Sequence, residues 1–493
     1  MQRLSIAALT RLPAHIEVPA YDREACGIGI VHLGIGAFHR AHQAVYTDDI
    51  LAAHGGDWAI AGVSLRGRSV PDQLNPQQGL YSVTALAGSA RHCRVIGAVR
   101  RVIFAPGERP ELLALMAAPA TRIVSLTVTE KGYYRDPASG RLLTGDPAIA
   151  ADLAAPESPA TAIGLLARAL DLRRQAGLAP FTVLSCDNLP DNGKSLRRLL
   201  LEYAGLISPS LAGWIEDNVA FPGTMVDRIV PAMTDEGLTC VADDLGYADA
   251  GSVITEPFSQ WVVEDNFPQG RPAWETAGAM LVEDVAPYEL IKLRLLNGPH
   301  SAMAYLGYLG GLEYISDCMD NAPMRAFVAA LMQEEIRPTL SAPGGFDLGA
   351  YIDDLLARFA NPSLRHKCWQ IAMDGSQKLP QRLLGTLAWR LQRGLPIGRL
   401  ALAVAGWVHY AAGIDLEGNP IDVRDPMADR LAAGLAPHLD EPQALAGAAL
   451  GIEEIFTPEL AANAAFAGAV TESLAALKQY GALGAVSHLA PPG

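Results

Sequence analysis

The chain has 493 residues, 50% hydrophobic and 18% charged, which is a globular composition and too long for one ordinary core. The formal net charge of −15 argues against nucleic acid or an anionic membrane surface as a partner. The six cysteines lie far apart without a C-x-x-C pair, which indicates reduced thiols and neither a disulfide framework nor a cysteine zinc site. Because neither a secretory segment nor a membrane-spanning run is recognised, we expect a cytoplasmic protein.

An apolar run from Ile28 to Leu33 predicts a buried strand, followed by a glycine-rich turn and a helix. The turn reads Gly34-Ile35-Gly36-Ala37-Phe38-His39-Arg40. Strand, glycine turn and helix in this order are the dinucleotide-binding fingerprint. His39 stands in the place of the third glycine, so the match is partial. His39 and His42 could hold a metal, but no carboxylate or cysteine completes a site nearby, and histidines on a helix surface are the favoured interpretation.

A second strand, residues 58–65, ends in Arg66-Gly67-Arg68-Ser69, without the acidic residue that would hold an adenosine ribose. Further strands are predicted at 93–96, 122–128 and 181–185. A strong helical pattern at 160–176 favours a parallel α/β sheet.

Two of these strands end in polar clusters, Thr129-Glu130-Lys131-Gly132-Tyr133 and Cys186-Asp187-Asn188. Ligands of open α/β sheets bind beyond the carboxyl ends of the strands. Asn188 is therefore a candidate site residue, although the segment could also be a simple turn. Farther along, Asp227 and Arg228 stand together, and a structural ion pair is the simpler interpretation there.

From about residue 287 the pattern is helical, at 324–336, 347–359, 379–391, 400–412 and 460–480. The predicted fold is α/β: an N-terminal Rossmann-like dinucleotide-binding domain, residues 1–285, followed by a mostly α-helical C-terminal domain, residues 286–493.

The first helical segment of the second part is an apolar run with four reactive side chains: Glu289, Lys292, Asn297 and His300. On a straight α-helix they fall within an arc of roughly 140°. Because Pro299 lacks an N–H and would clash one turn back, we expect a break at Asn297-Gly298, with Pro299 opening a second helix. Burial favours a neutral lysine that can act as a general base, and asparagine can donate to an oxygen that gains charge. From the spacing alone, the favoured interpretation is not catalytic: Lys292 extends from a core helix to solvent, and His300 is an ordinary core histidine.

Five motifs stand in order along the chain: Gly34-x-Gly36-x-Phe38-His39-Arg40-Ala41-His42, Thr127-x-Thr129-Glu130-x-Gly132-Tyr133, Ser185-Cys186-Asp187-Asn188, Val226-Asp227-Arg228 and Lys292-x4-Asn297-x2-His300. Together they resemble the mannitol dehydrogenase family of long-chain polyol dehydrogenases, over nearly the whole chain. The resemblance implies metal-independent hydride transfer between NAD and a secondary alcohol of a sugar alcohol or aldonate. Within the family, residues 361–367, 370–381 and 421–423 look most like members that act on D-fructuronate.

The resemblance also implies roles for single residues. Lys292 matches the general base, Asn188 and Asn297 the oxyanion-stabilising pair, His300 the substrate-orienting histidine, and Glu289 a carboxylate that relays the proton to solvent. Cofactor contacts are expected from the turn at Gly34, Ile35, Gly36, Ala37, Phe38, His39 and Arg40, and from Arg68, Ser69 and Thr129. Substrate contacts are expected from Asp227, Gln370, Lys378, Arg365 and Lys367.

Two positions depart from the family pattern. Gln370 stands where mannitol dehydrogenases carry a substrate-contacting arginine, which puts mannitol in doubt. Arg68-Ser69 stands where they carry acidic residues, which puts a strict NAD preference in doubt and leads us to expect that NADP is tolerated.

The expected reaction interconverts a ketose or keto-uronate and the matching polyol or aldonate, D-fructuronate and D-mannonate first, with D-mannitol and fructose as the alternative. A charged end group needs a paired partner, and Arg365, Lys367 and Lys378 around Gln370 offer cations. A solvated helix end is the other interpretation of Arg365 and Lys367. We expect a small-molecule sugar as the partner, and a monomer or small homo-oligomer.

Three other classes of protein fit the sequence less well. Tyr288-x-x-x-Lys292 fits the pair of a short-chain dehydrogenase, but that pair belongs much nearer the N-terminus, after a differently spaced glycine motif. A zinc alcohol dehydrogenase lacks its ligands here. A sugar-binding protein without catalysis would bind cofactor without turnover, although the intact lysine, asparagine and histidine set argues against it.

Overall fold

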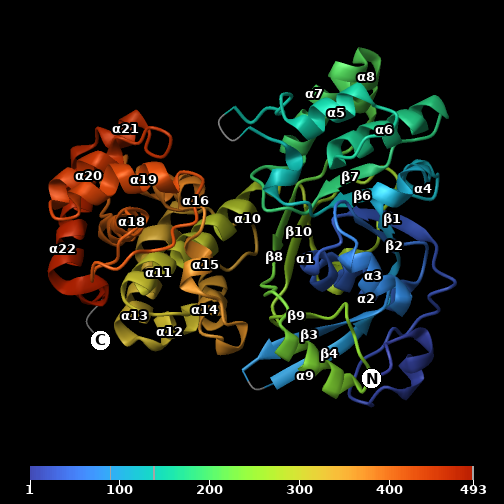
Figure 1. Ribbon diagram of the computed structural model, residues 1–493, viewed down its shortest axis with the longest axis horizontal. Helices are drawn as coiled ribbons and strands as arrows, with labels where there is room; N and C mark the ends of the chain where they lie inside the picture. Colours follow the sequence, from blue (N-terminus) through green and yellow to red (C-terminus); the bar gives the residue numbers. More distant parts are fainter. Residues whose placement is uncertain (89, 137–138, 491–493) are drawn as a thin grey trace. The chain divides into compact units, whose positions relative to one another are not determined.

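The computed structural model describes residues 1–88, 90–136 and 139–490, and the chain divides into two compact units, Met1–Ala286 and Pro287–Gly493. In the described residues every β-strand of three or more residues belongs to the first unit, and the second unit is helical (Figure 1). The predicted fold class, an α/β domain followed by a mostly helical one, is confirmed.

A five-stranded sheet forms the centre of the first unit, in the order β5-β2-β1-β6-β7 and with every pair parallel. Its strands are β1 (Ile28–Leu33), β2 (Ala59–Ser64), β5 (Val99–Phe104), β6 (Ile123–Leu126) and β7 (Thr182–Ser185). In chain order this is the 3-2-1-4-5 arrangement of a Rossmann sheet. The strand order reverses between β1 and β6, so a ligand crevice is expected beyond the carboxyl ends of these two strands.

The predicted strand at 93–96 exists, but it lies outside the parallel sheet. It is the end of β4 (Ala90–Ile96), which pairs antiparallel with β3 (Tyr81–Ala87) in a sheet completed by β9 (Val253–Thr255). The third strand of the parallel sheet is β5, which was missed because Arg100 and Arg101 interrupt its apolar pattern. A third sheet, β11-β10-β8, contains β8 (Thr224–Asp227), β10 (Gln260–Glu264) and β11 (Met280–Val282).

The helices of the first unit are α1 (Ala37–Ala41), α2 (Gln43–His54), α3 (Ser69–Leu74), α4 (Ala105–Ala117), α5 (Pro147–Ala154), α6 (Ala162–Gln175), α7 (Asn192–Ile207), α8 (Pro209–Asn218) and α9 (Asp235–Leu245), and α10 (Ala286–Ile291) spans the boundary. α6 begins where Thr161 Oγ1 accepts from Gly164 N at 3.0 Å, an N-cap that satisfies a free donor of the first turn.

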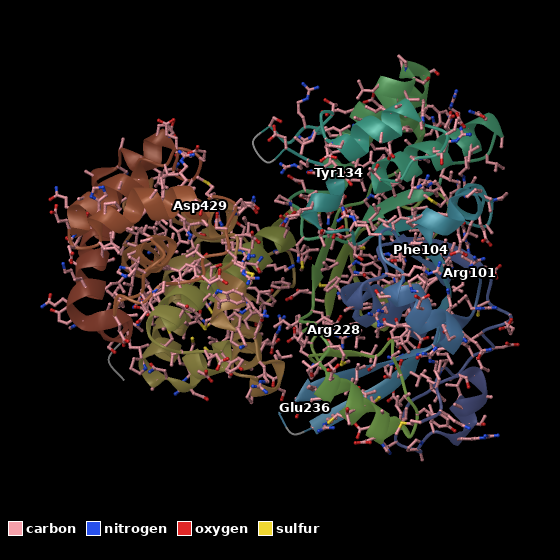
Figure 2. All side chains as sticks on the ribbon, viewed as in Figure 1. Arg101, Phe104, Tyr134, Arg228, Glu236 and Asp429 are labelled. Atoms are coloured by element: carbon pink, nitrogen blue, oxygen red, sulfur yellow. The ribbon has the colours of Figure 1, made fainter. Side chains whose placement is uncertain are left out.

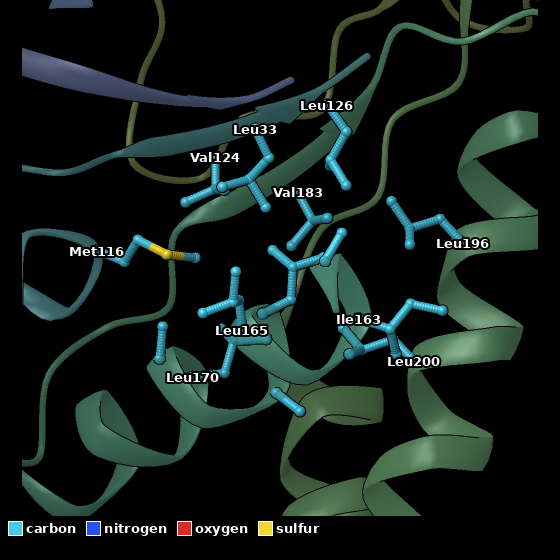
Figure 3. Packing of buried hydrophobic residues seen from close by; sticks show 14 of the residues in the cluster. Leu33, Met116, Val124, Leu126, Ile163, Leu165, Leu170, Val183, Leu196 and Leu200 are labelled. Carbon is cyan, nitrogen blue, oxygen red and sulfur yellow. The ribbon is translucent and has the colours of Figure 1, made fainter. Parts of the chain in front are cut away.

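One face of the parallel sheet is covered by leucines and isoleucines of α6 and α7. Figure 3 shows Leu33, Val124 and Val183 of the sheet packed with Ile163 and other side chains of these helices. Each such side chain contributes roughly 1.5–3 kcal/mol when it leaves water completely. This packing holds the strands in position, and it therefore also positions the loops that follow their carboxyl ends.

The second unit is a set of helices around one that is buried on all sides. Its members are α11 (Gly298–Leu309), α12 (Ile315–Asp320), α13 (Ala322–Ala330), α14 (Leu348–Phe359), α15 (Cys368–Ala372), α16 (Gly375–Leu379), α17 (Gly385–Leu391), α18 (Gly398–Ala411), α19 (Ala428–Leu435), α20 (Pro442–Leu450), α21 (Pro458–Ala461) and α22 (Ala464–Leu489). α18 is buried from Leu400 to Ala411 and packs against α11 and α22, as expected of a helix that is apolar all round. The carboxylate of Glu335 accepts from the N–H groups of Arg399 and Leu400 at 3.0 Å each and so caps this central helix.

The expected second helix is confirmed, because α11 begins at Gly298 with Pro299 in its first turn, but the expected break before it is wrong, because a π-helical turn joins α10 to α11. Between α10 and α11 lies η5 (Lys292–Asn297), in which Gly298 N donates to Leu293 O, five residues back. Because the π-turn contains one more residue than an α-turn, the backbone hydrogen bonds shift by one residue. The chain therefore stays helical up to Pro299, which has no N–H to donate. The arc calculated for a straight α-helix therefore does not apply to this segment.

None of the helices in the described ranges is long and apolar enough to cross a membrane. Across those same ranges no cluster of three or more histidine, cysteine, aspartate or glutamate side chains is placed to hold a metal ion.

Candidate active site

The turn after β1 has a geometry that requires glycine. Gly34 has φ 96°, and a Cβ there would lie 2.1 Å from the carbonyl oxygen of Thr127, at the end of β6. Gly34 N and Ile35 N both donate to Val63 O of β2, at 2.9 and 3.1 Å. At Gly36 the nearest atom to an added Cβ would be 3.9 Å away, so the backbone is open to a close approach. These glycines fit a dinucleotide pyrophosphate at the reversal point of the sheet.

His39, in the place of the third glycine, packs against the sheet as half of a stacked imidazole pair. Its ring lies 3.4 Å from the ring of His32 in β1, centroid to centroid, at an interplanar angle of 15°. His32 is held by Ser125 Oγ and Thr127 Oγ1, each at 2.8 Å. Burial lowers the pKa of His32 to about 3 and holds the pKa of His39 well below its ordinary value, so both rings are neutral.

The interpretation of His39 and His42 as histidines on a helix surface is wrong. Both are buried, and His42 Nε2 lies 2.9 Å from the carbonyl of Gln260 in β10. Within α1 the residues His39, Arg40 and Ala41 are buried, whereas Ala37 and Phe38 are partly exposed. The last residue of the turn, Arg40, is also buried and donates from Nε to Gly36 O at 3.3 Å.

The loop after β2 presents Arg68 and Ser69 to solvent. Arg68 Nε lies 3.6 Å from Asp72 Oδ1, one turn along α3, and its guanidinium lies 5.2 Å from the ring centre of Phe104, which is labelled in Figure 2. An exposed pair of this kind contributes little to stability and leaves the guanidinium able to rotate.

The loop after β6 is strained at Thr129 and is held there by Asp187. Thr129 has φ 65° and ψ 162°, a conformation that a β-branched residue adopts only under constraint. Asp187 accepts from Val128 N and Thr129 N at 2.9 Å each, and from the hydroxyl of Tyr133 at 2.7 Å. Burial raises the pKa of Asp187 above its ordinary value. Backbone strain of this kind clusters at ligand sites.

Asn188 is exposed and directly follows Asp187. Nearby, Asn192 Nδ2 donates to Asp187 O at 3.1 Å and to Thr224 O at 2.9 Å, which ties the exit of β7 to the start of β8.

Asp227, at the end of β8, is buried. The guanidinium of Arg228, labelled in Figure 2, donates to the carbonyls of Ala41 and Glu256. These bonds tie the end of β8 to α1 and to the segment after β9.

In the second unit, Lys292 opens the π-helical turn and is 7% exposed. Glu289 and Asn297 are partly exposed. Arg294 donates to Thr339 O at 3.0 Å and to Thr339 Oγ1 at 2.9 Å, so it anchors the turn to a neighbouring segment. The π-turn places an extra residue between Lys292 and His300, and such turns frequently occur at functional sites.

His300 lies among rings and cations, of which Lys378 was expected from the sequence as a substrate contact and Arg358 and Arg382 were not. Its ring is 5.0 Å from that of His366 and 5.2 Å from that of Phe359, centroid to centroid. Burial, followed by the charges of His366, Arg382, Arg358 and Lys378, holds the pKa of His300 well below its ordinary value. The imidazole is therefore neutral and able both to donate and to accept a hydrogen bond. Arg382 could have been found in the sequence as a basic residue four positions after Lys378, and His366 lies in the segment 361–367 that resembles the family. No sequence pattern pointed to Arg358.

Arg365 and Lys367, the two neighbours of His366 in the sequence, contact Tyr314 and Glu313. Arg365 Nη2 donates to Tyr314 Oη at 3.1 Å, and Lys367 Nζ lies 2.8 Å from a carboxylate oxygen of Glu313. Both cations are exposed, as is Gln370, while Lys378 Nζ donates to Ile371 O at 3.3 Å.

Comparison with known protein families matches both parts of the chain. The Mannitol dehydrogenase Rossmann domain matches residues 28–276, and the Mannitol dehydrogenase C-terminal domain matches residues 284–478. The chain belongs to the mannitol dehydrogenase family. The resemblance drawn from the five motifs is thereby confirmed.

Relatives in this family cover almost the whole chain. D-mannonate oxidoreductase of Escherichia coli K12 is 49% identical over 477 residues, which are 96% of this chain and 97% of the relative. An uncharacterised oxidoreductase of the same organism, YeiQ, is 48% identical over 97% of this chain and 98% of its own length. Among solved structures, Pseudomonas fluorescens mannitol 2-dehydrogenase in complex with NAD and D-mannitol has a TM-score of 0.88 and 37% identity, over 99% of both chains.

As a member of the mannitol dehydrogenase family, the chain is an NAD-dependent oxidoreductase that acts on secondary alcohols. Its glycine turn and parallel sheet have the geometry that a dinucleotide-binding site requires.

Proposed function

We propose that the protein interconverts D-fructuronate and D-mannonate. The observation that carries this proposal is the set of cations around His300, because a substrate that ends in a carboxylate needs positive partners when it leaves water. The 49% identity to D-mannonate oxidoreductase of Escherichia coli supports the same substrate. Gln370, in place of a substrate-contacting arginine, also distinguishes this chain from the pattern expected of mannitol dehydrogenases.

The proposed roles of the catalytic side chains follow the family pattern. In oxidation Lys292 accepts the proton of the substrate hydroxyl, and Asn188 and Asn297 donate hydrogen bonds to the oxygen as it gains charge. His300, neutral because it is buried, orients the substrate hydroxyl. Glu289 passes the proton from the lysine to solvent. The nicotinamide, when bound, supplies the hydride acceptor for oxidation and the hydride donor for reduction.

We assign NAD binding to the turn at residues 34–40 and to Thr129, and NADP tolerance to the loop after β2. A carboxylate at the ribose would repel a 2′-phosphate, whereas Arg68 and Ser69 offer a cation and a hydroxyl. Asp227, Gln370 and Lys378 are the proposed substrate contacts, with Arg365 and Lys367 as further candidates. A monomer or small homo-oligomer, metal independence and a cytoplasmic location stay predictions from the sequence.

The second candidate function is D-mannitol 2-dehydrogenase. It is favoured by the similarity to the Pseudomonas fluorescens enzyme bound to D-mannitol, at a TM-score of 0.88. Under this alternative the cations around His300 would serve folding alone, and a neutral ketose would be reduced as well as a charged one.

Initial rates separate the two candidates. D-fructuronate, D-fructose and D-tagaturonate are each reduced with NADH and with NADPH. We expect kcat/KM for D-fructuronate to exceed that for D-fructose by at least about tenfold, which corresponds to roughly 1.4 kcal/mol. An enzyme that prefers fructose, or that oxidises mannitol best, would reject the D-fructuronate assignment and establish the alternative.

A further inference from the structure

Two cations near His300 belong to one helical segment of the second unit. Lys378 belongs to α16 and Arg382 to the π-helical turn η9 (Pro380–Leu384), four residues later. Leu379 and Pro380 between them keep helical angles, so the segment is continuous. Side chains four apart on a helix are neighbours, and two like charges there repel each other.

Arg382 is anchored beside His300 by both its side chain and its backbone. Its Nη1 lies 3.1 Å from the hydroxyl oxygen of Ser301, the residue that follows His300 in α11. A Cβ added at Gly298 would lie 2.9 Å from the carbonyl oxygen of Arg382, so the two helices touch at the start of α11. The backbone contact and the hydrogen bond together hold Arg382 beside the first turn of α11, which contains His300.

Two further basic side chains lie near His300, those of Arg358 and His366. Arg358 of α14 is 8% exposed, and the ring of the next residue, Phe359, packs near His300. His366 packs edge-on against His300, and its buried Nδ1 has no hydrogen-bond partner in the part of the chain that the structure describes. A buried nitrogen without a partner, next to several cations, is what a site for an oxygen-rich anion presents in the absence of its ligand.

We propose that Arg382, together with Lys378, binds the carboxylate of a keto-uronate substrate, which makes Arg382 a specificity-determining residue. A guanidinium can give two parallel hydrogen bonds to a carboxylate, and the bound anion would offset the repulsion between the two cations. Arg365 and Lys367 are less suitable, because they already contact Tyr314 and Glu313. This inference rests on the proposed function, since it concerns the charged end of the same substrate.

The test compares two substrates that differ only in that end group. In Arg382→Gln we expect kcat/KM for D-fructuronate to fall roughly 10- to 100-fold, mostly through KM, while kcat/KM for D-fructose changes less than about threefold. Arg382→Lys keeps a charge but loses the paired geometry, and should recover part of the loss. Arg430→Gln is the matched control, because it removes an exposed guanidinium of the same unit that is paired with Glu454, and both substrates should react as with the wild type.

A milder variant covers the case in which Arg382→Gln does not fold, as judged by thermal unfolding. Ser301→Ala removes only the anchor of the guanidinium and should raise KM for D-fructuronate roughly 2- to 10-fold, with KM for D-fructose unchanged. Calorimetric titration with D-mannonate gives a readout without turnover and should show the same loss of affinity in both variants.

The outcomes separate this inference from the proposed function. If the wild type prefers D-fructuronate and Arg382→Gln slows both substrates equally, Arg382 serves folding and the inference is overturned while the function stands. If Arg365→Gln removes the preference and Arg382→Gln does not, the carboxylate binds at Arg365 and the inference is again overturned. A wild type that prefers D-fructose rejects the proposed function itself.

Discussion

Asp187 gives the sharpest test of how the first unit holds the loop after β6. Its two carboxylate oxygens accept from Val128 N, Thr129 N and the hydroxyl of Tyr133, at 2.9, 2.9 and 2.7 Å. In Asp187→Asn one oxygen becomes an NH₂ group, which would face at least one of these donors. The substitution keeps the shape of the side chain and removes part of its accepting capacity.

The expected loss follows from these contacts. One hydrogen bond to a charged acceptor is worth about 1.5–3 kcal/mol. Two effects offset part of it: the carboxylate no longer has to be buried, a cost shown by the raised pKa of Asp187, and Thr129 can release a part of its backbone strain. We expect a net destabilisation of about 1–2 kcal/mol, which lowers the Tm of the first unit by roughly 2–8 °C.

The assay pairs thermal unfolding with NADH titration by fluorescence. Because Thr129 is a proposed cofactor contact, the Kd for NADH should rise roughly tenfold as its loop relaxes, which corresponds to about 1.4 kcal/mol. Asp244→Asn is the control, since it removes a carboxylate of a surface pair with Arg91 and should change the stability by less than about 1 kcal/mol. If Asp187→Asn unfolds and binds NADH like the wild type, the carboxylate does not hold Thr129 in place.

Three further predictions concern the base, the cofactor and the pH dependence of stability. Lys292→Ala should lose roughly 10²–10⁴-fold in turnover while it still binds NADH, and wild-type turnover in this variant at neutral pH would remove the proposed mechanism. NADPH should support a measurable kcat/KM, and a negligible value would mean that Arg68 points away from the ribose. His32 has a pKa of about 3 in the folded protein and roughly 6.5 when unfolded, so the unfolded state binds more protons below about pH 6.5 and stability is lost as the pH falls, by up to about 1.4 kcal/mol per pH unit. Denaturant unfolding between pH 5 and 8 should show a flatter slope for His32→Gln and an unchanged slope for the exposed His15→Gln.

The sequence by itself determined the features that depend on local backbone chemistry and on side-chain period. The glycine turn was visible because only glycine tolerates the conformation of Gly34, at φ 96°. The helices of the second unit were visible because an apolar face repeats with the helical period, as in α14. The order of five motifs was enough to identify the family, since each motif combines such a local constraint with a reactive side chain.

Only the tertiary structure decided which distant residues meet. His39 takes the place of a glycine because His32, on the strand beneath, stacks against it. β5 belongs to the parallel sheet despite its two arginines, because its partner β2 supplies the ladder of hydrogen bonds. Arg382 reaches Ser301 across 81 residues, and no local pattern encodes that contact. Turns and helices are set by neighbours in sequence, whereas the charge around His300 is set by how α11, α14 and η9 pack, which is a property of the whole fold.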